Sequence, residues 1–157
     1  MSKSKFQIRE FRSEDIGAVL RLHHEALKAI NAWIGSGKWD SDLQDIERAY
    51  LKNGGAFLIG TVDGQIVAMG ALRIILPEVG EIKRMRVSPD FQRRGFGQAI
   101  LTTLEKEALS RGCRLLVLDT TVRQVAAQNV YLKNGYREIR RVKEGFLLET
   151  IFYEKSI

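Results

Sequence analysis

A strand, a glycine-containing loop and a long helix follow one another between residues 79 and 110, and this succession constrains the fold more than any other part of the sequence. The strand pattern ends at Val87, the loop carries Gly95 and Gly97, and apolar residues then recur at helical spacing up to Ser110. The first N–H groups of a helix have no partner within it, and glycines let a ligand approach the backbone closely. The sequence therefore predicts a site for phosphate oxygens where this helix begins.

The remaining patterns predict an α/β (α+β) fold with the element order βααβββαβαββ. The expected strands lie at residues 6–11, 57–62, 65–75, 79–87, 114–119, 136–142 and 146–154, with a last turn at 144–145, and the expected helices at 13–30, 41–52, 95–110 and 124–134. Asp63-Gly64 is typical of a tight hairpin turn. Ser41 with Gln44 has the form of a capping box that opens the second helix, with Asp42 as a helix-start acid. This order implies a mixed sheet with helices on both faces.

Length and composition indicate one globular domain spanning residues 1–157. The chain has 45% apolar and 28% charged residues, an ordinary balance for a soluble protein. Its one cysteine, Cys113, excludes an intramolecular disulfide and, with only two adjacent histidines, a Cys/His zinc site, so we expect no metal. No apolar run approaches the ~18–20 residues of a membrane span, and the first residues lack the apolar segment of a signal peptide. We therefore expect a cytoplasmic protein in a reducing compartment, with no membrane partner.

The net charge of +6 leaves three interpretations open. Basic residues gather at 83–94 and again at 137–143. They could bind nucleic acid, line a pocket for a phosphate-bearing small molecule, or form a solvated surface. No RNA-recognition aromatic motif, basic zipper or zinc finger accompanies them, which argues against nucleic acid. From composition alone, a solvated basic surface is the simplest explanation.

Three known phosphate loops can be compared with residues 92–97. The Walker A loop is excluded because the chain contains no Gly-Lys-Ser/Thr. The dinucleotide fingerprint Gly-x-Gly-x-x-Gly/Ala is half met, because Ile100 stands at its third small position, although Asp119 lies near the distance expected for its ribose-binding acid. The pyrophosphate loop of acyl-CoA-dependent acetyltransferases, Gln/Arg-x-x-Gly-x-Gly/Ala, is met at every fixed position by Gln92-Arg93-Arg94-Gly95-Phe96-Gly97.

On these residues the chain resembles the GNAT superfamily of acetyl-CoA-dependent N-acetyltransferases, from about Phe6 to Glu154. The loop follows a strand that ends Met85-Arg86-Val87-Ser88-Pro89, and residues 130–136, Val-Tyr-Leu-Lys-Asn-Gly-Tyr, resemble the family's Leu-Tyr-x-x-x-Gly-Phe helix end. The resemblance implies the GNAT fold, with a central mixed sheet splayed between its fourth and fifth strands, and acetyl-CoA as co-substrate. It also implies a pyrophosphate cradle made by Gln92, Arg93, Arg94, Gly95, Phe96, Gly97 and Gln98.

The strand at residues 79–88 carries apolar residues at an irregular spacing. Ile82, Met85 and Val87 are three and then two residues apart, so a regular strand would put Ile82 and Met85 on opposite faces. Either both faces are buried, or a β-bulge shifts the phase by one residue. The GNAT family has such a bulge here. By resemblance, the main chain at Met85, Arg86 and Val87 then binds the pantetheine arm of the co-substrate, and an N–H near Met85 polarises the thioester carbonyl.

The resemblance also assigns two catalytic residues. Tyr131 lies where the family's tyrosine protonates the departing thiolate, and a phenol with an ordinary pKa of ~10 is protonated at neutral pH. The alternative for Tyr131 is a packed aromatic with its hydroxyl satisfied elsewhere. Glu81 lies at a strand position from which relatives draw a general base, often acting through a water. The alternative for Glu81 is a carboxylate paired with Lys83 or Arg84.

Further contacts with the substrates follow from the same resemblance. Many family members have an Asn seven residues before the tyrosine, contacting pantetheine. Here Gln124 stands there, with Asn129 as an alternative. Family acceptors are gripped between the first two helices and by the last hairpin. In the first of these regions Trp39 could form an aromatic wall and Asp40 could attract a cationic amine. The histidine pair of the first helix is expected to have no catalytic role, with one side chain packed and the other facing solvent.

The sequence thus predicts an N-acetyltransferase that moves the acetyl group of acetyl-CoA directly to a primary amine in a ternary complex. The acceptor is a small molecule or a peptide amine, and a homodimer is compatible with the family. Two alternatives stay open. A non-catalytic acyl-CoA-binding or sensing module would need neither Tyr131 nor Glu81, and a nucleic-acid binder would lose affinity steeply with added salt.

Overall fold

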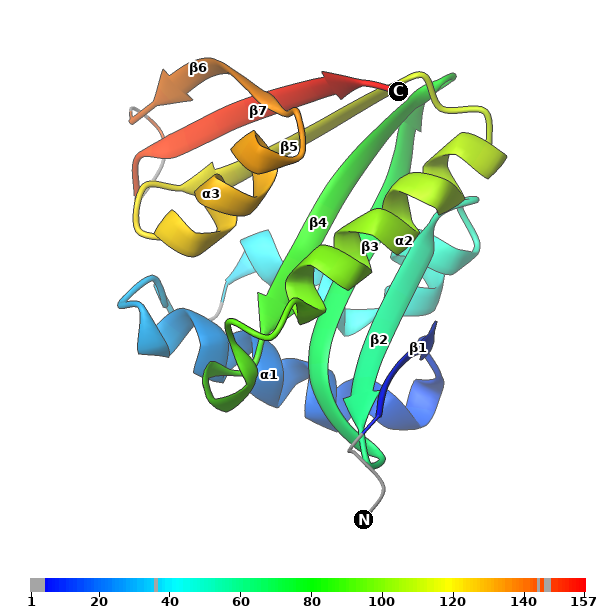
Figure 1. The fold of residues 1–157 in the computed structure, drawn as a ribbon, viewed down its shortest axis with the longest axis vertical. Coiled ribbons are helices and arrows are strands. Elements are labelled where there is room, and N and C mark those ends of the chain that lie inside the picture. Colours follow the sequence, from blue (N-terminus) through cyan, green and yellow to red (C-terminus); the bar gives the residue numbers. More distant parts are fainter. Residues whose placement is uncertain (1–4, 36, 144, 146–147) are drawn as a thin grey trace.

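The computed structural model describes residues 5–157 except 36, 144, 146 and 147. These residues form a mixed sheet of seven strands in the order β1-β2-β3-β4-β5-β7-β6 (Figure 1). The strands are β1 Phe6–Glu10, β2 Ala56–Val62, β3 Gln65–Leu76, β4 Val79–Val87, β5 Leu115–Thr121, β6 Arg137–Val142 and β7 Thr150–Ser156. β4 and β5 pair in parallel, and the other neighbours pair in antiparallel. Asp63 and Gly64 have φ of 50° and 80°, as the predicted hairpin turn requires.

Helices cover both faces of this sheet. The α-helices are α1 Ile16–Ala29, α2 Phe96–Ser110 and α3 Val125–Lys133. Figure 1 shows α2 in front of β3 and β4 and α3 in front of the strands that follow. Side chains of α1 pack in a separate core cluster on the opposite face. The predicted mixed sheet with helices on both faces is therefore confirmed.

The second predicted helix, at residues 41–52, is present as two short helical pieces and not as one continuous α-helix that opens at a capping box. Lys38–Gln44 form a 3-10 segment and Glu47–Leu51 a single π-helical turn. Both Asp40 and Asp42 bind Arg84 of β4, at 3.0 and 2.5 Å. Residues two apart do not face one another on an α-helix, so a regular helix could not bring both carboxylates to one guanidinium. Asp42 is therefore a partner of β4 rather than a helix-start acid.

The last two strands pair in antiparallel as expected, but the second of them is shorter than predicted. β7 begins at Thr150 rather than at residue 146, because Thr150 pairs with Val142, the last residue of β6. The predicted turn includes Gly145, which has a φ of 79°. Its other residue, 144, and the predicted strand residues 146 and 147 lie outside the described residues.

β4 contains the bulge that its apolar spacing suggested. Met69 of β3 pairs with Arg86, but Ala71, two residues on, pairs with Lys83, so β4 carries one extra residue. The extra residue lies at Arg84, whose φ of 59° is unusual for a residue with a side chain. Because of this shift, Ile82, Met85 and Val87 all pack against the core cluster that includes α2.

β4 and β5 separate after three paired residues. Val79, Gly80 and Glu81 pair with residues 115–117, and no pairing continues beyond Glu81. Figure 1 shows the two strands diverging from this point, with β5, β7 and β6 turned away from β4. The splay implied between the fourth and fifth strands is therefore present, and it leaves one edge of β4 open.

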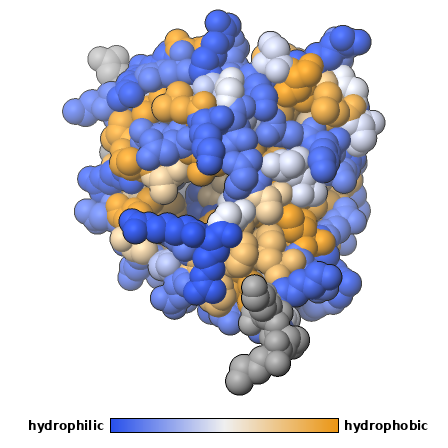
Figure 2. Space-filling view, viewed as in Figure 1, coloured by the Kyte–Doolittle hydropathy of each residue, from blue (hydrophilic) through white to orange (hydrophobic). Residues whose placement is uncertain are grey.

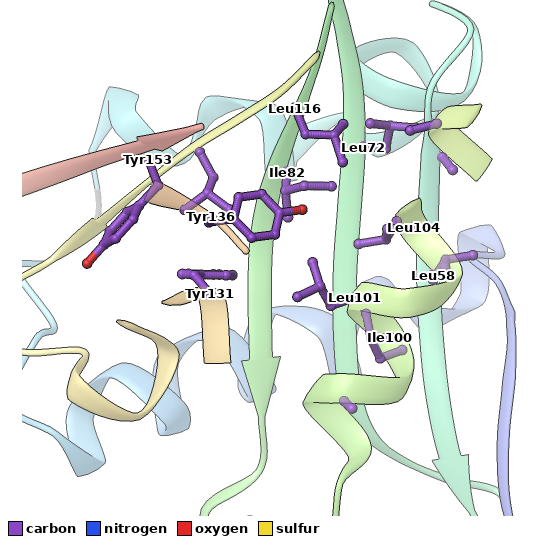
Figure 3. Close-up of a cluster of buried hydrophobic side chains, with 14 of the residues drawn as sticks. Leu58, Leu72, Ile82, Ile100, Leu101, Leu104, Leu116, Tyr131, Tyr136 and Tyr153 are labelled. Atoms are coloured by element: carbon purple, nitrogen blue, oxygen red, sulfur yellow. The ribbon is translucent and has the colours of Figure 1, made fainter. Parts of the chain in front are cut away.

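Two apolar clusters hold the sheet between its helices. On the α2 side, Ile100, Leu101 and Leu104 are fully buried against β2–β4. Figure 3 shows these side chains to the right of β4, Tyr131 and Tyr153 to its left, and the Tyr136 ring in front of it. The tyrosine rings belong to the same buried cluster, so α3 and β7 are joined to the main core across the splay.

The surface drawn in Figure 2 mixes hydrophilic side chains with small apolar patches. No helix among the described residues is long and apolar enough to cross a membrane.

Candidate active site

The loop between β4 and α2 leaves room for a ligand at its glycines. Gly95, directly before the first helical residue, has a φ of 83°, which residues with side chains rarely adopt. A Cβ added to Gly95 would meet nothing within 4 Å, and one added to Gly97 would meet the Val87 side chain at 3.4 Å. The unpaired N–H groups and the positive end of the α2 dipole lie at this open turn. The loop therefore fits a pyrophosphate.

Two side chains of the predicted cradle are held by the protein itself. The Phe96 ring stacks on Phe6, with centroids 4.1 Å apart. The amides of Gln98 and Asn134 donate to each other, at 2.8 and 2.7 Å, and so tie α2 to the end of α3. Phe96 and Gln98 therefore shape the loop through their side chains and can offer a ligand their backbone N–H groups.

The two arginines of the loop are exposed. Arg94 lies over the ring of Phe91, 5.0 Å from its centroid, and donates to the carbonyl of Asp90 at 3.4 Å. Arg93 has a φ of 63° and makes no ion pair among the described residues. Both guanidinium groups can therefore reach an anion at the start of α2.

The open edge of β4 presents main-chain groups toward the splay. The Met85 carbonyl accepts a hydrogen bond from Arg86 Nη1 at 2.7 Å, and the Val87 carbonyl accepts one from Gln92 Nε2 at 3.3 Å. Neither carbonyl is used by a β5 strand partner, since the β4–β5 pairing has already ended. An extended ligand could pair with this edge as an added strand.

Tyr131 lies where the splay meets α3. Its ring is buried beside Tyr136 and Tyr153, with centroids 5.7 and 6.1 Å away. Among the described residues, no group hydrogen-bonds to its hydroxyl. Burial raises the pKa of Tyr131 to about 12, and the positive charge of Arg86 opposes this shift. The hydroxyl is therefore a protonated donor at neutral pH.

Glu81 lies at the apex of the splay, in the last β4–β5 pair. Its carboxylate accepts from Arg73 Nη2 at 2.8 Å and lies 3.9 Å from Lys83 Nζ. The side chain is 21% exposed. The carboxylate is thus both reachable and ion-paired.

A pocket of about 290 Å³ opens on the α1 side of the splay. Side chains from α1, the 32–40 segment, the bulge of β4 and the end of β5 line it. It is partly enclosed by Trp33 and Trp39, and the Trp39 Nε1 donates to the Gly35 carbonyl at 3.3 Å. A second hollow lies beside β1 and the β2–β3 turn, and none of the predicted site residues lines it.

An ion cluster forms one wall of the pocket. Arg84 Nε and Nη2 donate to both oxygens of Asp42, at 2.9 and 2.5 Å, and its Nη1 donates to Asp40 at 3.0 Å. Tyr50 donates its hydroxyl proton to Asp42. Burial raises the pKa values of Asp40 and Asp42, but their hydrogen bonds and the charge of Arg84 outweigh it and lower both. Both carboxylates are therefore charged at neutral pH.

His23 of α1 completes this wall. Its Nε2 lies 3.2 Å from Asp40 Oδ1, and burial lowers its pKa. The imidazole is therefore neutral at pH 7.

Comparison with known proteins identifies the family. The sequence model of the acetyltransferase (GNAT) family matches residues 20–136. The chain belongs to the GNAT family of acetyltransferases. An acetyltransferase of Pectobacterium atrosepticum is 30% identical over 141 residues, which cover 88% of this chain and 93% of that protein.

Solved structures agree in fold over nearly the whole chain. A GNAT acetyltransferase of Staphylococcus aureus Mu50 superposes with a TM-score of 0.88 at 22% identity, covering 97% of this chain and 99% of that one. A Salmonella typhimurium protein solved with its cofactor acetyl-CoA superposes with a TM-score of 0.77 at 18% identity, covering 96% and 93% of the two chains.

The two residues predicted to contact the acceptor of this GNAT enzyme, Trp39 and Asp40, both line the pocket. Gln124, which was predicted to contact pantetheine, lines the same pocket. However, Asp40 is already engaged by Arg84 and His23, so its charge is not free for an amine. The side-chain oxygen of Gln124 accepts from Thr120, and Asn129 is exposed on α3 outside the pocket.

Sequence reasoning did not assign most of the pocket lining of this acetyltransferase. Among the unassigned side chains are polar or charged ones from α1, β4 and β5: His23, Lys83, Arg84, Asp119 and Thr121. Arg84, with 10% of its side chain exposed, is not part of a solvated basic surface. The sequence could have shown part of this lining, because side chains alternate along a strand and Asp119 and Thr121, two residues apart, therefore lie on the same face of β5.

Arg86 was predicted as a main-chain contact for the co-substrate, and its side chain also lines the pocket. The phase shift of the bulge places it on the same face of β4 as Lys83 and Arg84.

Proposed function

We propose that this GNAT enzyme transfers the acetyl group of acetyl-CoA directly to a primary amine held in the 290 Å³ pocket. One observation supports the proposal. The opening where β4 and β5 separate lies between two parts of the site: the glycine loop follows the end of β4, and the pocket lies on the α1 side of the sheet. A donor and an acceptor can therefore meet through the opening. The one cysteine, Cys113, is buried in the core and lines no part of the pocket, which argues against an acetylated cysteine as an intermediate.

In this proposal each part of the chain has a distinct role. Arg93, Arg94 and the N–H groups that open α2 bind the pyrophosphate, and the β4 edge from Met85 to Val87 binds the pantetheine arm. Acetyl-CoA supplies an acetyl group activated as a thioester. Tyr131 donates a proton to the departing sulfur, and Glu81 accepts one from the amine. An amine panel assayed for thiol release with acetyl-CoA tests the activity, and no release with any amine would contradict it.

Gly97→Asp tests the cradle. We expect the affinity for acetyl-CoA to fall about 10²-fold, because a carboxylate at this turn repels the pyrophosphate. The fold should persist, since a Cβ here meets only Val87 at 3.4 Å and an acid near a helix start is favourable. Calorimetry with acetyl-CoA measures the change. Gly97→Ala is the matched control, and its affinity for acetyl-CoA should stay within a few-fold of wild type. Equal losses of affinity in both variants would mean that the charge of the aspartate does not cause the effect.

Glu81→Gln tests the proton acceptor. At saturating amine, kcat of the wild type should fall as the pH is lowered, because a base must be deprotonated to act. In the variant we expect this acid limb to flatten and kcat at its maximum to drop about 10²-fold. Glu78→Gln, at an exposed ion pair in the turn directly before β4, is the control. An acid limb that is the same in Glu81→Gln and wild type would remove Glu81 from the reaction.

A further inference from the structure

Two charged groups of the pocket have no partner of opposite charge. Arg84 is paired with Asp40 and Asp42, and Lys83 lies 3.9 Å from Glu81. Arg86 and Asp119 line the same pocket, and among the described residues neither takes part in an ion pair. The pocket therefore offers one unpaired cation and one unpaired anion.

The guanidinium of Arg86 is also short of hydrogen-bond acceptors. Its Nη1 donates to the neighbouring Met85 carbonyl, but its Nε is buried and has no hydrogen-bond partner within the described part of the chain. The hydroxyl of Thr121, a pocket residue on the facing strand β5, is likewise buried with no partner among these residues. Buried donors are normally satisfied, and leaving them unpaired is costly. Burial lowers the pKa of Arg86 to about 10, so it is still a cation at neutral pH.

Asp119 supplies the opposite charge. It follows Leu118 on β5, beyond the point where β4 and β5 part, and its side chain is exposed to the pocket. Burial raises its pKa, with the nearby Glu81 adding to the effect and Lys83 opposing it. Its carboxylate is therefore a poorly compensated charge that a bound ammonium would stabilise.

The rest of the lining is largely apolar. Leu27, Trp33, Ile34 and Trp39 form the side of the pocket away from the strands. At about 290 Å³ the pocket is at the small end of the range for ligand sites. These properties favour one small molecule with two opposite charges and an apolar group.

We propose that the acceptor is a free α-amino acid with an apolar side chain. Its carboxylate binds Arg86 and the Thr121 hydroxyl, its ammonium faces Asp119, and its side chain packs against the tryptophans. This inference rests on the proposed acetyl transfer and specifies its substrate class. Transfer forms the bond from nitrogen to the acetyl carbon and breaks the carbon–sulfur bond. The ammonium loses two protons: one replaces the proton that Tyr131 gives to sulfur, and the other leaves through Glu81 to solvent.

Three matched amines test the need for the carboxylate: L-leucine, L-leucinamide and 3-methylbutylamine. All three carry the same branched alkyl group and a primary amine, but only leucine carries a carboxylate. We expect kcat/KM for leucine to exceed that for the other two by about 10²-fold or more, because the analogues leave Arg86 unpaired. L-Phenylalanine and its amide provide a second pair, and spermidine represents acceptors without an anion. Equal kcat/KM for acid and amide in both pairs would overturn the inference.

Arg86→Met tests the residue. We expect KM for leucine to rise about 10²-fold, far more than KM for leucinamide, and Arg86→Lys to restore part of this difference. Arg140→Met, on the exposed strand β6, is the control. If Arg86→Met lowers kcat by the same factor for leucine and leucinamide, Arg86 acts in the transfer step itself, and the proposal that it binds the carboxylate of the amino acid is wrong.

A binding measurement separates this inference from the proposed activity. Calorimetry follows leucine titrated into wild type and Arg86→Met, each saturated with CoA. Binding that is lost in Arg86→Met, without turnover of any amine, would support the site and contradict acetyl transfer. Turnover of spermidine without binding or turnover of either amino acid would support transfer and overturn the site.

Discussion

Tyr131→Phe is expected to lower kcat about 10²–10⁴-fold, the usual contribution of a positioned general acid. The hydroxyl makes no hydrogen bond among the described residues, while its ring is packed in the tyrosine cluster of Figure 3. The change therefore removes the proton donor and keeps the packing. Steady-state kinetics with a good amine acceptor measures kcat, and calorimetry should show a Kd for acetyl-CoA within about twofold of wild type, since the phenol meets only the departing sulfur.

Tyr136→Phe is the matched control for this experiment. The Tyr136 hydroxyl is buried, no described residue hydrogen-bonds to it, and its ring lies in the same cluster. Removing it should leave kcat and stability close to wild type, because no hydrogen bond is lost. If Tyr131→Phe and Tyr136→Phe have the same kcat as wild type, another group protonates the sulfur.

The pH profile gives a second check on Tyr131. A general acid must be protonated, so it imposes a basic limb only above its own pKa. Burial raises the pKa of Tyr131 to about 12, and therefore the phenol stays protonated across the usual assay range. We expect kcat of the wild type to show no decline from this group up to pH 10. A decline below pH 9 that disappears in Tyr131→Phe would show a much lower pKa than the structure implies.

Local sequence signals predicted the parts of the site that depend on local geometry. The ligand-accessible loop at Gly95 and Gly97, the turn at Asp63-Gly64 and the bulge in β4 each follow from residue types or spacing within a few positions. The family resemblance pointed to Tyr131, whose ring is buried beside the splay and whose hydroxyl makes no hydrogen bond within the described part of the chain.

The acceptor side depends on contacts between distant residues. Arg84 meets Asp42 across 42 positions of sequence. This contact holds the 3-10 segment Lys38–Gln44 against β4, and no propensity within residues 38–52 contains that information. The family resemblance assigned the main chain of Arg86 to the co-substrate, and the structure shows that its side chain also lines the pocket. Sequence patterns thus located the donor half of the site better than the acceptor half.

Arg84→Ala is expected to lower the free energy of unfolding by about 3–5 kcal/mol at pH 7, the usual effect of removing one partner from a buried ion pair. The side chains of Asp40 and Asp42 are 16% and 12% exposed, and without Arg84 their charges lack a cation at hydrogen-bond distance. Urea denaturation followed by circular dichroism measures the loss. Arg137→Ala is the control: Arg137 pairs with Glu154 but is 78% exposed, so its loss should cost less than about 1 kcal/mol.

The same variant has a pH signature that a packing defect would lack. In the wild type the pKa values of Asp40 and Asp42 are lowered, so the stability they contribute is present above their unfolded pKa of ~3.9 and is lost as the pH falls below it. Without Arg84, burial is expected to raise both values, and protonation would then stabilise the variant as the pH falls toward 4. The difference in free energy of unfolding between wild type and Arg84→Ala should therefore shrink as the pH falls from 7 to 4. A difference that stays constant over this range would mean that Arg84 stabilises the fold by packing, and that the charges of Asp40 and Asp42 do not depend on it.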